Sequence, residues 1–148
     1  MFCEDIARLY ERDILKIKNE MLAYADEDQR WELVPGISNS GGNLCLHLLG
    51  NLQHYIGAIL GKSGYIRNRP EEFSLKNVPV TELVACIERT LLIVSQTIRT
   101  LDTDILESQY PEKVFDYDMT VQYFLLHLLA HLSYHLGQIN YHRRIVSA

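Results

Sequence analysis

Four stretches of this 148-residue chain repeat apolar residues at alternating spacings of four and three. Such spacing places the residues on one face of an α-helix, as in helices that pack side by side. The pattern predicts helices over residues 4–24, 42–60, 79–101 and 119–146. No stretch convincingly predicts a strand, so the expected fold class is all-α, with residues 1–148 forming one four-helix bundle domain. The first predicted helix carries the stripe Cys3, Ala7, Tyr10, Ile14, Ile17, Met21 and Tyr24.

Two of the predicted helices are separated by a connection longer than a tight turn. Residues 61–78 join the second and third helices, and this length favours a crossover between helices that are not antiparallel neighbours. Residues 102–118 form a second connection, interrupted by Pro111. Before the second helix, Asn39 or Ser40 is the expected N-cap.

The formal net charge of −5 argues against nucleic acid or an anionic membrane surface as a partner, because both require a basic face. No apolar run approaches the roughly 20 residues of a membrane span, and the acidic start of the chain does not have the pattern of a signal peptide. Cys3, Cys45 and Cys86 are widely spaced, which is typical of reduced thiols. We therefore expect a cytoplasmic protein.

A histidine pair in the fourth predicted helix indicates a metal site. His131 and His135 are four residues apart, so both imidazoles project from one helical face and can bind a single transition-metal ion. His47 lies on an inward stripe of the second helix and is the candidate third ligand. The pair belongs to a stripe that we expect to face inward, made up of Phe124, Leu128, His131, His135, Gln138, His142 and Ile145.

The remaining histidines leave alternatives open. His54 either supports or replaces a ligand, or packs in the core or at an exposed edge, while His127 and His142 are expected to line a pocket or lie at the surface. Gln138 either hydrogen-bonds a ligand or makes a contact between helices. For Gly137 we expect the close approach of a neighbouring backbone.

Two segments resemble the DinB-like superfamily: NLCLHLLGNL at residues 43–52 and HLSYHLGQI at residues 131–139. The resemblance extends through the helix pattern to essentially the whole chain. It implies an up-down-down-up bundle with a divalent metal, often nickel or zinc, held by three histidines. Carried over by position, these ligands are His47, His131 and His135.

The characterised members of that superfamily suggest transfer of a thiol onto an electrophile. We therefore expect a metal-dependent thiol S-transferase whose partners are a low-molecular-weight thiol and an electrophilic substrate, in a homodimer. Three imidazoles leave a coordination position open, which also suits a metal-dependent hydrolase. The remaining alternatives are a non-catalytic bundle or binding protein that the metal stabilises, and a bundle without metal.

Overall fold

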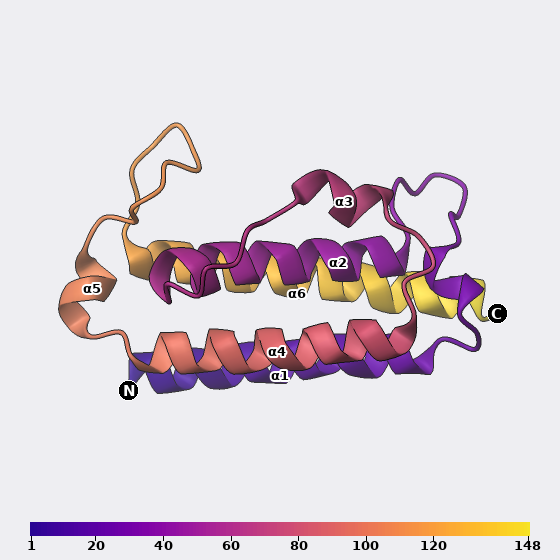
Figure 1. Ribbon diagram of the computed structural model, residues 1–148, viewed down its shortest axis with the longest axis horizontal. Helices are drawn as coiled ribbons and strands as arrows, with labels where there is room; N and C mark the ends of the chain where they lie inside the picture. Colours follow the sequence, from indigo (N-terminus) through magenta and orange to yellow (C-terminus); the bar gives the residue numbers. More distant parts are fainter.

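The computed structural model describes all 148 residues, and every regular element in it is helical. Four long helices lie side by side (Figure 1): α1 (Phe2–Ala23), α2 (Gly41–Leu52), α4 (Val80–Arg99) and α6 (Val121–Val146). The shorter elements are the 3₁₀ helix η1 (Asp28–Trp31), the π-helix η2 (Gln53–Leu60), α3 (Arg69–Ser74) and α5 (Thr103–Glu107). The only β-type pairing is an isolated bridge between Gln109 and Thr120. The expected all-α class is confirmed.

Contacts between the long helices establish their relative directions. Arg99 near the end of α4 pairs with Glu4 near the start of α1, so these helices run antiparallel. The Tyr10 hydroxyl of α1 donates to the carbonyl of Leu125, early in α6 (2.6 Å). Since residues late in α1 likewise contact residues late in α6, as Glu20 does with Asn140, α1 and α6 run parallel.

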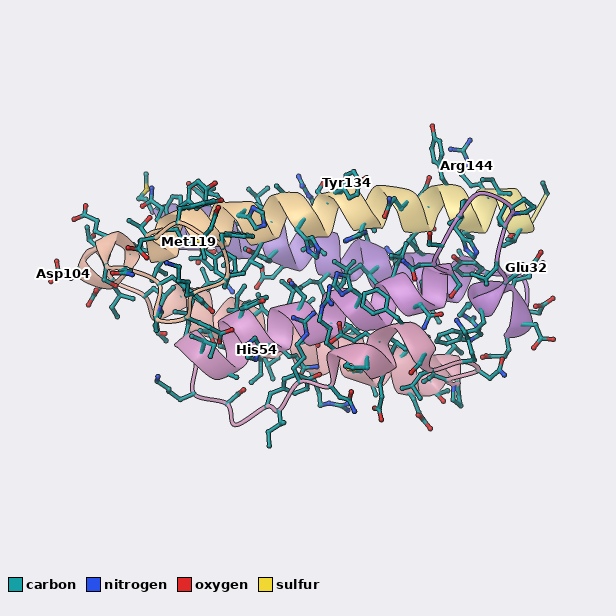
Figure 2. All side chains as sticks on the ribbon, turned by 90° about the horizontal axis from the view of Figure 1, so that it is seen from above. Glu32, His54, Asp104, Met119, Tyr134 and Arg144 are labelled. Carbon is teal, nitrogen blue, oxygen red and sulfur yellow. The ribbon has the colours of Figure 1, made fainter.

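The helix α2 runs antiparallel to α6 and parallel to α4. Its His47 lies against His131 of α6, while Tyr55, further along the chain in η2, contacts Phe124, which is earlier in α6. From the end of η2, the connection returns along the molecule and carries α3 on its way to α4 (Figure 1). One end of the molecule holds Asp104 and Met119, and the other holds Glu32 and Arg144 (Figure 2).

The boundaries of the four long helices agree with the predicted ones to within about two residues. The second predicted helix, however, differs from the prediction in its helix type. Ser40 is the N-cap of α2, and its hydroxyl accepts the N–H of Asn43 (3.2 Å), as expected. After Leu52, however, the predicted α-helix continues as the π-helix η2. The helix predicted over residues 42–60 is therefore present over its full length, but only its first part is α-helical.

The core contains 28 buried hydrophobic residues. In α1, every member of the expected inward stripe is buried except Cys3, which is half-buried. The expected stripe on α6 is only partly correct: Phe124, Leu128 and His142 are buried, but Gln138 and Ile145 are exposed. Leu132 and Ile139 take the central positions instead, so the stripe carrying His131 and His135 lies at the edge of the core.

None of the helices combines the length and apolar character that crossing a bilayer requires.

Candidate metal centre

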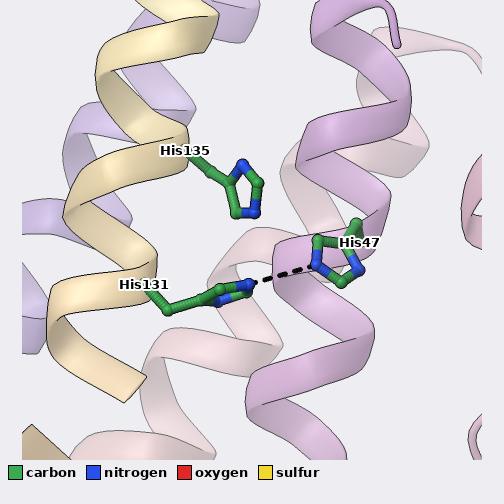
Figure 3. Close-up of side chains that lie close together, drawn as sticks. All are labelled: His47, His131 and His135. Carbon is green, nitrogen blue, oxygen red and sulfur yellow. Dashed lines mark hydrogen bonds between the residues drawn. The ribbon is translucent and has the colours of Figure 1, made fainter. Parts of the chain in front are cut away.

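Three histidines converge between α2 and α6 (Figure 3). His131 and His135 project from successive turns of α6, and His47 faces them from α2. The candidate ligand atoms of the three side chains all lie within 4.8 Å of one another. The Nε2 atoms of His47 and His131 are 3.3 Å apart. The cluster can therefore hold a metal ion, and these are the residues that the sequence predicted; their binding of a metal stays a prediction.

The environment of the α6 pair favours neutral imidazoles. Burial, together with the nearby rings of His135 and His47, lowers the pKa of His131 to about 4. Burial also lowers the pKa of His135, even though the hydrogen bond that His135 makes to Gln138 acts in the opposite direction. Because a metal binds the unprotonated ring nitrogen, these shifts hold the pair in the form that a ligand requires.

Hydrogen bonds to residues outside the cluster fix the rings of His47 and His135 but not the ring of His131. The Nδ1 of His135 donates to the side-chain oxygen of Gln138 (2.7 Å), which leaves its Nε2 unprotonated. His131 has no hydrogen bond outside the cluster, and its Nδ1 is buried without a partner. An unpaired buried polar atom costs about 1–3 kcal/mol. The set of three converging imidazoles fits a site for a metal ion.

The carboxylate of Glu72 contacts His47 on the ring nitrogen Nδ1, and the sequence analysis did not identify this residue. The Nδ1 of His47 lies 3.0 Å from Oε1 of Glu72, which belongs to α3 in the connection between α2 and α4. Arg67 donates to both oxygens of the same carboxylate, at 2.8 and 2.9 Å. No sequence signal identifies Glu72, because it lies outside the periodic helices and its neighbour Glu71 has the same residue type.

The other histidines lie outside the cluster. His54 approaches the carboxylate of Glu112 (3.1 Å), and His127 packs against Phe115 with ring centroids 5.0 Å apart. His142 is buried: it accepts from the Tyr24 hydroxyl (2.7 Å) and donates to the Glu32 carbonyl (2.8 Å). The surface alternative for His142 is therefore wrong, although the residue does border a groove.

That groove has a volume of about 840 Å³ and lies between residues 36–39 and the second half of α6. His135 forms part of its wall, so the histidine cluster is next to open space. Apolar side chains such as Leu44 and Tyr141 line it, and no Asp, Glu, Lys or Arg side chain does. Gly137 also borders the groove, and a Cβ built on it meets nothing within 4 Å. The expected close approach of a backbone to Gly137 was therefore wrong.

Replacing Gly137 with alanine is expected to stabilise the protein. The residue is exposed inside α6, where glycine costs about 0.5–1 kcal/mol relative to alanine, and the new methyl group meets no obstacle. Urea denaturation should show this gain in the free energy of unfolding. The contrasting control is Gly41→Ala, whose Cβ would collide with the buried Tyr24 hydroxyl and should destabilise the protein. A loss of stability in Gly137→Ala would contradict the open environment.

The fold and the cluster together define an all-helical protein with a candidate three-histidine metal centre. Over residues 5–148 the chain matches the family described as "Protein of unknown function (DUF1572)". This match covers nearly the whole chain, and the protein belongs to that family. No curated protein matches it.

Proposed function

We propose that the protein is a metal-dependent enzyme of the DinB-like superfamily, built as an up-down-down-up four-helix bundle. In support, the DUF1572 family is placed in the DinB-like clan. The directions deduced from the helix contacts support that topology. His47, His131 and His135 would hold the ion, with nickel or zinc as the expected metal. A cytoplasmic location and a homodimeric state belong to the same proposal.

The observation that carries an enzymatic role is the position of His135. Its ring belongs both to the cluster and to the wall of the groove, so a molecule in the groove reaches one of the three candidate ligands. Structural metal sites are closed by four protein ligands, whereas catalytic sites keep a position free. Only three histidines converge here, and this number fits the catalytic kind.

The reaction that we favour is transfer of a low-molecular-weight thiol onto an electrophile. A bound divalent ion supplies Lewis acidity, which lowers the pKa of a thiol or of water toward neutrality. The protein contributes three imidazoles, two of them held in place by Gln138 and Glu72, together with a groove that receives the second substrate. Because no formally charged side chain lines the groove, we expect the electrophile to be uncharged and mostly apolar.

The test compares metal-loaded and metal-free protein that was purified without an affinity tag. Elemental analysis gives the metal content, and turnover is then measured with uncharged electrophiles and a small thiol, and separately with esters. Metal-dependent consumption of the thiol supports the transferase, whereas ester cleavage without thiol identifies a hydrolase. Metal binding without turnover across the panel would identify a non-catalytic, metal-stabilised protein and overturn the proposal.

A further inference from the structure

Glu72 is a buried carboxylate at the back of the histidine cluster. Its residue exposure is 5%, and its Oε1 lies 3.0 Å from Nδ1 of His47, a residue 25 positions earlier in the chain. Burying a carboxylate is unfavourable unless hydrogen bonds and an opposite charge compensate. Arg67 supplies the hydrogen bonds and the opposite charge, since its guanidinium donates to both carboxylate oxygens. The structure thus places an ionised acceptor directly behind one candidate ligand.

The surroundings of Glu72 are shaped to admit it. A Cβ on Gly50, one helical turn after His47, would lie 1.9 Å from Oε2 of Glu72, so only glycine leaves room for the carboxylate. The side chain of Asn43 donates to the backbone carbonyls of Glu72 (3.0 Å) and Leu75 (2.9 Å), which anchors α3 against α2. These contacts fix the position of the carboxylate, which is therefore not a loosely placed surface group.

The ring of His47 is held on a second side by the same short helix. Phe73, the next residue in α3, packs against it with ring centroids 4.9 Å apart. Arg67 donates to both oxygens of Glu72, and this paired charge favours the ionised carboxylate. An ionised carboxylate only accepts hydrogen bonds, so Nδ1 of His47 carries the proton, and in the neutral ring Nε2 then keeps its lone pair.

We propose that Glu72 is the positioning residue of the metal centre: it holds His47 in the Nδ1–H tautomer and directs Nε2 toward His131 and His135. This inference rests on the proposed function, because it assigns a role toward the same metal. Carboxylates that accept the second N–H of a ligating histidine fix its orientation and raise its basicity. Among the three histidines, His47 alone has a charged acceptor, since His135 uses the neutral Gln138.

The tautomer of His47 can be measured without any metal. Nitrogen-15 NMR of the metal-free protein should show His47 protonated at Nδ1 and bare at Nε2. Dominance of the Nε2–H tautomer would overturn the inference whether or not the protein binds metal. This readout also separates the two proposals, because a protein that fails to bind metal can still show the predicted tautomer.

Metal affinity supplies the second test, with Zn²⁺ titrated calorimetrically into the metal-free protein. Glu72→Gln should weaken binding by roughly 10- to 100-fold, the range found when such supporting groups are removed. The matched control is Glu71→Gln, which removes the same charge from the adjacent, exposed position of α3 and should leave affinity unchanged. Equal affinities of both variants and the unmodified protein would overturn the inference.

A third variant addresses the possibility that Glu72→Gln does not fold. Gly50→Ala retains both the carboxylate and His47 but removes the space that Glu72 occupies. It should shift His47 toward a mixture of tautomers and weaken Zn²⁺ binding in the same direction as Glu72→Gln. A Gly50→Ala protein with an unaltered His47 tautomer and unaltered affinity would count against the role of Glu72.

Discussion

Replacing His135 with alanine is expected to abolish one-to-one metal binding. The change removes one of three converging imidazoles and leaves a pair from different helices, His47 and His131. Loss of a group that only supports a ligand already costs roughly 10- to 100-fold in affinity. Loss of a ligand should cost more than that, so protein purified without a tag should contain no stoichiometric metal by elemental analysis.

The control for this experiment is His54→Ala. His54 lies near Glu112, outside the cluster, so its removal should leave metal content unchanged. Comparing the two variants separates the loss of a specific ligand from a general loss of imidazole. If His135→Ala retained one metal ion per chain, the three-histidine assignment would be wrong.

Adding metal to the metal-free protein is expected to raise its thermal stability strongly. An ion that binds only the folded state, present at a thousand times its Kd, adds about 4 kcal/mol to the free energy of unfolding. For a chain of this size, that gain corresponds to a rise in Tm of roughly 10 °C. The expected cause is that one ion joins α2 to α6 through His47, His131 and His135.

Thermal unfolding followed by circular dichroism, with Zn²⁺ or with a chelator, measures this effect. The His135→Ala variant serves as the control, and its Tm should be nearly the same under both conditions. Equal melting temperatures of the unmodified protein with and without the ion would show that the cluster does not bind Zn²⁺ in the folded state.

Periodic spacing predicted the long helices and the face that His131 and His135 share. The reason is visible in α1, where every residue of the expected stripe from Ala7 to Tyr24 is buried. His131 and His135 needed only helical geometry to share a face. The phase of the second helix placed both His47 and His54 on one stripe, and the family resemblance pointed to His47. These features are local in sequence, so a single chain carries enough information to predict them.

Long-range contacts and short elements could not be predicted from the sequence, for a physical reason. Helices α3 and α5 contain 6 and 5 residues, too few for a periodic pattern to emerge. Glu72 reaches His47 only because the connection folds back over α2, and no local pattern encodes that path. On α6, Leu132 and Ile139 occupy the core where the expected stripe has His131 and Gln138, although His142 further along is buried. The phase of this 26-residue helix was therefore predicted only in part.

The connection between α2 and α4 consists of two parts with unequal tolerance to changes in chain length. Around Gly64, side chains are exposed and a Cβ on this glycine meets nothing, so inserted residues can bulge into water. From Arg67 to Leu75, the backbone and side chains are tied to α2. Lengthening this second part would withdraw the carboxylate from His47, so natural variation in loop length should concentrate in the first part.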